Sequence, residues 1–382
     1  MSSPPNGNLG TTMNRRRAIV TITAAFAGAG TCHAATKVIR QSQHQPEVPW
    51  LGEVTKLRDP LPTDPVLTPL MQAAGRPRAE SLAHWKQRRI TLLRDWQAVL
   101  GVLPPRPARP PQFEVLESTK TDHVVRQRIR YDTLPGETTE AYLLKPVSKK
   151  EALPRAGFAV FHSTVNHSIR QPAGVQGKPE KAFGWHLANR GHFAICPRNF
   201  LWPTNDGISA SSQAAAHLKK YPGTLGMARM LWEAQLAVDI LAGLSGVDPQ
   251  RLGSVGHSLG AKEVLYLAAF DERIKVTVSS EGGIGLPFSN WNAPWYLGPA
   301  INQPQFQRNH HELLAFAAPR PFLLLGGDSA DGEKSTPYIA AAQQIYQLYG
   351  APIRLGLFNH KAGHSVPQVA FDRTLEWLET YV

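Results

Sequence analysis

The sequence predicts an α/β fold, a mostly parallel twisted sheet flanked by helices, with an N-terminal helical extension. Short apolar runs that suit buried strands alternate with helix-forming segments from residue 157 to the C-terminus. At one point a strand, the turn Gly256-His257-Ser258-Leu259-Gly260 and a helix follow one another directly. The composition, 42% hydrophobic and 18% charged over 382 residues, allows one large buried core.

Residues 1–34 have the pattern of an export signal. Arg15, Arg16 and Arg17 precede an apolar stretch over residues 18–30, and small residues surround Ala34. Arginines ahead of a modest apolar stretch are typical of a twin-arginine signal, and this stretch is too short to span a membrane. We therefore expect an exported protein, periplasmic or extracellular. Cys32 is an alternative lipidation site, but no large aliphatic residue directly precedes it.

Residues 35–111 are predicted to form a Pro-rich wrapping segment and one amphipathic helix. Over residues 78–101 large apolar residues recur at helical spacing and Gly101 ends the pattern; they are Leu82, Trp85, Ile90, Leu93, Trp96 and Leu100. We expect this apolar stripe to pack against the main domain. The prolines of residues 104–111 then provide a stiff connector.

Residues 112–382 are predicted to form the main domain. It begins with two or three antiparallel strands over residues 113–147, where polar and apolar residues alternate. Further strands are expected at 157–162, 193–197, 251–256, 274–280, 321–326 and 353–358. Helices are expected at 183–190, 225–244, 261–270, 337–349 and 367–381. Residues 282–308 form a long insertion after one of these strands.

Ser258 lies at the centre of a G-x-S-x-G turn between a strand and a helix, the context of a nucleophile elbow. Such a bend presents the serine hydroxyl clear of the backbone, and Gly256 and Gly260 leave room for the adjoining strand and helix. The hydroxyl needs a base to become a good nucleophile. His364 is the main candidate because it lies between the last strand and the last helix, whereas His360 follows the strand too closely.

Three carboxylates are candidates for the acid that orients the histidine. Asp331 follows the penultimate strand, which is the usual position, and Asp328 lies nearer the end of the same strand. Glu281 ends the strand that follows the elbow helix and also points to the edge of the sheet where ligands bind. Geometry decides between them, so the sequence leaves all three open.

An oxyanion hole is expected beside the nucleophile. One donor is the backbone N–H of Leu259, and the other comes from the loop after strand 157–162, from Thr164 or Ser163. His162, in the same loop, is interpreted as structural.

Aromatic residues mark the insertion, among them Trp291 and Trp295. Over the carboxyl edge of a sheet, they either wall a pocket for sugar rings or aryl esters, or cover apolar surface. Trp202, in the loop after strand 193–197, is placed to face the insertion. The run His310-His311-Glu312 contains metal-ligand residue types, but adjacent side chains point to different sides of a helix. We expect neither a metal nor a cofactor.

From about residue 113 onward the chain resembles α/β-hydrolases of the dienelactone hydrolase and acetyl xylan esterase group. The stretches that carry the resemblance are 247–253, the elbow, 268–275, 318–321 and Gly363-His364. Lys262 and Glu281 also look like features of glucuronoyl esterases, a resemblance that implies a uronate contact for the lysine and the triad acid for the glutamate. The chain departs from that family at Leu259, where those enzymes carry arginine.

These observations predict an exported serine esterase that acts on small-molecule or glycan esters, with acetyl or other carbohydrate esters as candidate substrates. A serine peptidase, a dienelactone-type hydrolase and a noncatalytic glycan-binding homologue are the alternatives. The formal charge of +12 falls to +9 when the three signal arginines are removed, which suits anionic partners or a solvated basic surface. No basic stripe with interleaved aromatic residues points to nucleic acid, and neither stable membrane insertion nor a particular oligomeric state is indicated.

Overall fold

The computed structural model describes residues 46–57, 61, 67–71, 81–147, 153–204 and 207–382. The predicted export signal and Cys32 lie outside the described residues.

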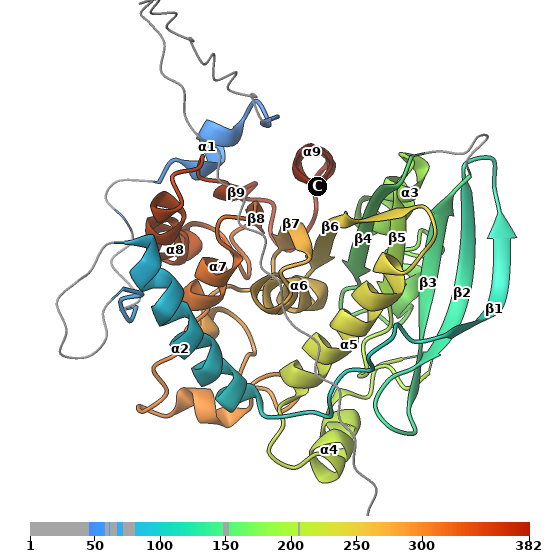
Figure 1. Ribbon diagram of the computed structural model, residues 1–382, viewed down its shortest axis with the longest axis horizontal. Coiled ribbons are helices and arrows are strands. Elements are labelled where there is room, and N and C mark those ends of the chain that lie inside the picture. Colours follow the sequence, from blue (N-terminus) through green and yellow to red (C-terminus); the bar gives the residue numbers. More distant parts are fainter. Residues whose placement is uncertain (1–45, 58–60, 62–66, 72–80, 148–152, 205–206) are drawn as a thin grey trace, which may run out of the picture. The chain divides into compact units, whose positions relative to one another are not determined.

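The described residues form one nine-stranded sheet in the order β1-β2-β3-β5-β4-β6-β7-β8-β9 (Figure 1). Strands β1, β2, β3 and β5 are paired antiparallel, and the pairs from β5 through β4 to β9 are parallel. The bounds are β1 Phe113–Lys120, β2 Val124–Asp132, β3 Thr138–Pro146, β4 Arg155–Phe161, β5 Phe193–Pro197, β6 Val247–His257, β7 Ile274–Ser280, β8 Phe322–Gly326 and β9 Leu355–Asn359.

Helices cover both faces of the sheet, as Figure 1 shows. One apolar core unites α2, α5, α6, α7 and α8 with one face, and a second unites α1, α3 and α9 with the other. The α-helices are α1 Leu51–Thr55, α2 Leu82–Leu100, α3 Phe183–Asn189, α4 Ala210–Lys220, α5 Gly226–Ala242, α6 Leu259–Phe270, α7 His311–Ala317, α8 Thr336–Leu348 and α9 Gln368–Tyr381. Short 3₁₀ turns are η1 Ser168–Arg170, η2 Pro179–Lys181, η3 Leu286–Phe288, η4 Pro299–Asn302 and η5 Glu333–Ser335.

The predicted α/β class is confirmed, and the differences have local causes. β6 begins at Val247, four residues before the predicted start, because Val247 pairs with Arg155 at the start of β4. The sequence pattern missed α4, which buries just Ala214 and His217 and therefore shows little apolar periodicity. It also missed the short helices α1 and α7.

The segments before β1 pack onto this domain. Val54 of α1 contacts Gly356 of β9, and Trp50 stacks on Trp377 of α9 with ring centroids 5.7 Å apart. Helix α2 buries Trp85 and Trp96, but Ile90, which the helical spacing placed on the packed face, is 53% exposed. Helix α2 therefore packs against the main domain through its two tryptophans together with Leu92 and Leu100.

Trp96 also joins α2 to α7 through a polar contact. Its indole N–H donates to Glu312 Oε2 at 2.6 Å, in a site where both side chains are buried. Burial raises the pKa of Glu312 to about 7, and the charge of Arg308 and the hydrogen bond from Trp96 oppose that rise. The indole of Trp85, on the same helix, is equally buried and has no hydrogen-bond partner.

These two tryptophans provide a matched test of that contact. We expect Trp96→Phe to lower the free energy of unfolding by about 1–3 kcal/mol more than Trp85→Phe, since both lose the same ring volume and Trp96→Phe alone removes the hydrogen-bond donor of the buried Glu312 Oε2, leaving the carboxylate with the Arg308 ion pair. Urea unfolding of the two variants measures the difference. Equal losses would show that the indole–carboxylate bond contributes nothing to the docking of α2.

Candidate active site

Ser258 lies on a strained turn between β6 and α6. Its backbone angles are φ 60° and ψ −113°, a region that residues with a side chain rarely adopt. A Cβ at Gly256 would collide with the backbone of Gly260, and a Cβ at Gly260 would collide with the carbonyl of Phe161. Both glycines are therefore required for β4, β6 and α6 to approach as closely as they do, and this approach holds the serine in its strained conformation.

His364 reaches the serine from the loop between β9 and α9. Its Nε2 lies 2.9 Å from Ser258 Oγ, across 106 residues of sequence. The side chain of His364 is 44% exposed to solvent. His360, the competing histidine, accepts a hydrogen bond from the Ala362 N–H within its own loop instead. The structure thus brings Ser258 and His364 together, in the arrangement of a nucleophile and its base.

Glu281 supplies the carboxylate next to the imidazole. Its Oε2 lies 3.2 Å from His364 Nδ1, and it also accepts hydrogen bonds from the backbone N–H groups of Gly327, Ala330 and Asp331. Burial raises the pKa of this carboxyl, but the hydrogen bonds from His364 and the amides outweigh it and the net pKa lies below the ordinary value. Glu281 is therefore an ionised, fixed acceptor for the imidazole N–H.

Asp331 and Asp328 lie elsewhere. Asp331 is fully buried and accepts hydrogen bonds from the amides of Gly283 and Ile284, both at 2.7 Å, and from the Ser335 hydroxyl at 2.9 Å. Asp328 accepts from the Asn359 amide at 2.7 Å. The chain-order rule favoured Asp331, but its carboxylate braces the loop that follows β7 rather than meeting the imidazole.

A second histidine, His257, lies beside the first with its ring tilted by 47°. The two rings lie 4.8 Å apart between centroids, and His257 Nε2 lies 3.0 Å from the Lys181 ammonium while its Nδ1 lies 2.9 Å from Ser280 Oγ. Burial, followed by the charge of Lys181, lowers the pKa of His257 well below the ordinary value. No sequence signal pointed to Lys181, which lies in a loop 76 residues before its partner.

The predicted oxyanion donors lie at the start of α6 and in the loop after β4. The Leu259 N–H is the first of helix α6, so it has no carbonyl partner within the helix. In the loop after β4, the Ser163 N–H donates to Gln171 Oε1 at 3.1 Å, which leaves Thr164 as the better candidate. His162 is buried, and its Nε2 accepts from the Asn199 N–H at 3.2 Å while its Nδ1 contacts the Ser163 carbonyl. These contacts fit the structural role predicted for His162.

Lys262 lies one helical turn after the nucleophile and is 4% exposed. Its ammonium donates to Ser289 Oγ at 2.9 Å and lies 3.8 Å from the centre of the Trp291 ring. Trp291 is itself buried and donates to the Gly283 carbonyl, so this part of the insertion packs against α6. Trp295, also in the insertion, is half-buried.

Trp202 contacts Val165 and His162 in the loop after β4 rather than the tryptophans of the insertion. It is buried, donates to the Val165 carbonyl at 2.9 Å and meets the His162 ring edge to face. The rings of His310 and His311 are bonded to separate partners, Ile284 and Thr68. Among the described residues, no group of three or more His, Cys, Asp or Glu side chains could hold a metal ion.

Lys262 makes stability depend on pH. Burial lowers its pKa to about 7, with the charge of Asp331 opposing, whereas a lysine in the unfolded chain titrates near 10.4. Burying the protonated amine therefore lowers the free energy of unfolding. This penalty has its full size below about pH 7 and disappears as the pH approaches about 10. We expect Lys262→Met to raise the free energy of unfolding by about 1–3 kcal/mol near pH 6.5, and by much less near pH 9.5.

Urea unfolding at the two pH values measures this effect, with Lys219→Met at an exposed position of α4 as the control. A gain that stays constant or grows with pH would show that the buried amine is not the source.

No protein-family model matches the chain. Its curated relatives align over different shares of its length. YtaP of Bacillus subtilis, whose name assigns it to the hydrolases, is 25% identical over 249 residues, which cover 63% of this chain and 80% of YtaP. A 4-O-methyl-glucuronoyl methylesterase of Thermothelomyces thermophilus is 27% identical over 148 residues, 32% of this chain and 37% of the enzyme.

Solved structures match more of the chain. A glucuronoyl esterase of Solibacter usitatus superposes with a TM-score of 0.65 at 18% identity, covering 85% of this chain and 99% of that one. A Bacteroides fragilis protein assigned to the acetyl xylan esterases has a TM-score of 0.61 at 14% identity, covering 74% and 76%. No helix in the described residues combines the length and apolar character needed to cross a membrane. The chain has the α/β-hydrolase fold, and it is similar to glucuronoyl esterases and an acetyl xylan esterase.

Proposed function

We propose that the chain is a serine esterase that hydrolyses carboxylic esters on carbohydrates. The observation that carries the proposal is the continuous hydrogen-bonded path from Ser258 Oγ through His364 to Glu281, with distances of 2.9 and 3.2 Å. Nucleophile, base and orienting acid come from the ends of β6, β9 and β7 respectively, the carboxyl edge where ligands bind in open α/β sheets. The similar hydrolases and carbohydrate esterases support the same reaction class.

The reaction begins when Ser258 Oγ attacks the ester carbonyl and its proton passes to His364 Nε2. The carboxylate of Glu281 stabilises the imidazolium through Nδ1–H, and the N–H groups of Leu259 and Thr164 hold the oxyanion. The alcohol leaves with the proton from His364, and the acyl group remains on Ser258. Water then gives a proton to His364 and attacks the acyl-enzyme, which releases the carboxylic acid and restores the serine.

The substrate class follows from the surroundings of the nucleophile. Lys262 lies one turn beyond Ser258 with its ammonium against Ser289 and the Trp291 ring, and both side chains are buried, so in this structure neither presents a surface to a sugar. At Leu259 the apolar side chain replaces the arginine of glucuronoyl esterases, so the contacts that such an arginine makes are absent. We therefore assign acetyl or other carbohydrate esters as substrates rather than the glucuronoyl ester alone. Export through the signal over residues 1–34 would bring the enzyme to such glycans.

Removing the nucleophile tests the proposal. We expect Ser258→Ala to lower the turnover of p-nitrophenyl acetate to the rate left by the oxyanion donors and binding alone, a loss on the order of 10³-fold or more. Absorbance at early times should show a burst of p-nitrophenol with the wild type and none with the variant. A retained burst would reject Ser258 as the nucleophile.

The choice of acid is tested by two isosteric variants. We expect Glu281→Gln to lower kcat on the order of 10²–10⁴-fold, because the amide no longer stabilises the imidazolium. Asp331→Asn should cost mainly stability, since its carboxylate bonds to Gly283, Ile284 and Ser335. Steady-state kinetics and thermal unfolding of both variants separate the effects. A larger loss of kcat in folded Asp331→Asn than in Glu281→Gln would reverse the assignment.

A further inference from the structure

A polar cavity of about 650 Å³ opens where β3 begins and β5 ends. Its volume falls in the range of about 300–1,000 Å³ that is typical of small-molecule sites. The lining residues come from β2, β3, the loop after β5, and helices α4 and α5. They are Arg130, Glu137, Thr138, Thr139, Glu140, Arg198, Phe200, Trp202, Pro203, Thr204, Gln213, Arg229 and Glu233.

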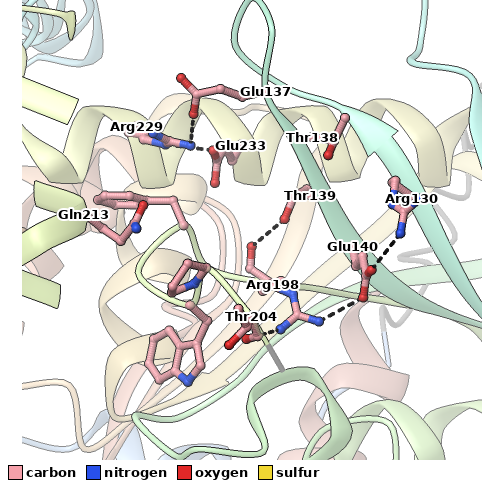
Figure 2. Close-up of a pocket in the computed structure, with 13 residues that line it drawn as sticks. Arg130, Glu137, Thr138, Thr139, Glu140, Arg198, Thr204, Gln213, Arg229 and Glu233 are labelled. Carbon is pink, nitrogen blue, oxygen red and sulfur yellow. Dashed lines mark hydrogen bonds and ion pairs between the residues drawn. The ribbon is translucent and has the colours of Figure 1, made fainter. Parts of the chain in front are cut away.

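Two groups of ion pairs line the cavity, and Figure 2 shows them apart from each other with the β3 threonines between. In the first, Arg229 of α5 donates to Glu233 at 2.9 Å and to Glu137 at 2.5 Å. In the second, Glu140 of β3 accepts from Arg198 at 2.9 Å and from Arg130 at 3.4 Å. The side chains of Arg198 and Glu233 are 7% and 6% exposed, so the cavity has a fixed polar wall.

The cavity adjoins the candidate active site. Since β4 lies between β5 and β6, the ends of β5 and β6 are two strand spacings apart, about 10 Å. Contacts join the two places as well. The N–H of Asn199, directly after Arg198, donates to His162, and Trp202 packs on the same ring, beside the loop that carries Thr164.

The lining favours a neutral polyhydroxylated ligand. Its three arginines and three glutamates have a formal charge of zero, so the wall offers no net attraction to an anion. Guanidinium groups donate and carboxylates accept, and a sugar hydroxyl can do both. Phe200, Trp202 and Pro203 supply apolar surface next to these groups, as sugar rings require.

We infer that this cavity binds neutral sugar units of the glycan whose ester is hydrolysed at Ser258. The inference rests on the proposed esterase function and extends it, because it assigns the enzyme a saccharide subsite separate from the ester-binding centre. The chain then recognises an oligosaccharide rather than the acyl group and one sugar alone.

Calorimetric titration of the full-length protein with neutral tetrasaccharides tests this inference. The probes are xylotetraose, cellotetraose and mannotetraose, with tetragalacturonic acid as the anionic comparison. We expect at least one neutral probe to bind more tightly than the acid. Thr138→Trp, which fills the cavity from β3, should weaken that binding on the order of tenfold or more. Thr119→Trp, an equal change at an exposed position of β1, should leave it unchanged.

The outcomes separate the two proposals. Failure of all neutral probes to bind, preference for the acid, or equal binding by Thr138→Trp and Thr119→Trp would overturn the subsite. Circular dichroism and thermal unfolding establish that both tryptophan variants are folded. If the wild type bound a neutral probe in the cavity yet did not turn over p-nitrophenyl acetate, the esterase proposal would fail and saccharide binding by the cavity would stand.

Discussion

The buried carboxylate of Glu281 is the constraint on which the arrangement of the site depends. Its side chain has no solvent exposure, so its charge must be compensated within the protein. The amides of Gly327 and Ala330, in the loop after β8, provide much of this compensation. In return Asp331, from that loop, accepts from the amides of Gly283 and Ile284 in the loop after β7. The two loops therefore stabilise each other, because a carboxylate of each accepts hydrogen bonds from backbone amides of the other.

This exchange explains why the sequence left the order of the candidate carboxylates open. The loop position of Asp331 is the usual one for a triad acid, and chain order carries no information on which carboxylate faces His364 and which faces amides. The backbone of Glu281 has a positive φ of 56°. Residues other than glycine rarely adopt such an angle, and no sequence pattern predicts it here. By contrast, the elbow was predictable because its two glycines are required by close backbone contacts.

Sequence reasoning about the fold also succeeded where local patterns decide the structure and failed where tertiary contacts do. Strands β4 to β8 were found from apolar runs, because helices cover both of their faces, and the partly buried edge strand β9 was found as well. Helix α4 was missed because it buries so few apolar side chains, and Ile90 was misplaced because spacing alone does not say how wide the buried face of α2 is. The polar cavity was also beyond sequence reasoning. Its arginines and glutamates meet through three arrangements: Arg229 and Glu233 share α5, Arg130 faces Glu140 across the β2–β3 pair, and the pairing of β3 with β5 brings Arg198 beside Glu140.

The neighbouring imidazoles of His257 and His364 have different charged partners, which favours His364 as the base in the proposed reaction. The ring centroids of His257 and His364 lie 4.8 Å apart, but the groups that the two rings contact differ. His257 Nε2 faces the ammonium of Lys181, so it acts as an acceptor there, and a proton on that nitrogen would meet a like charge. His364 instead has a carboxylate on its far side, which stabilises the imidazolium as it forms. In the proposed reaction the proton of Ser258 therefore passes to His364, whose Nε2 lies 2.9 Å from the serine Oγ.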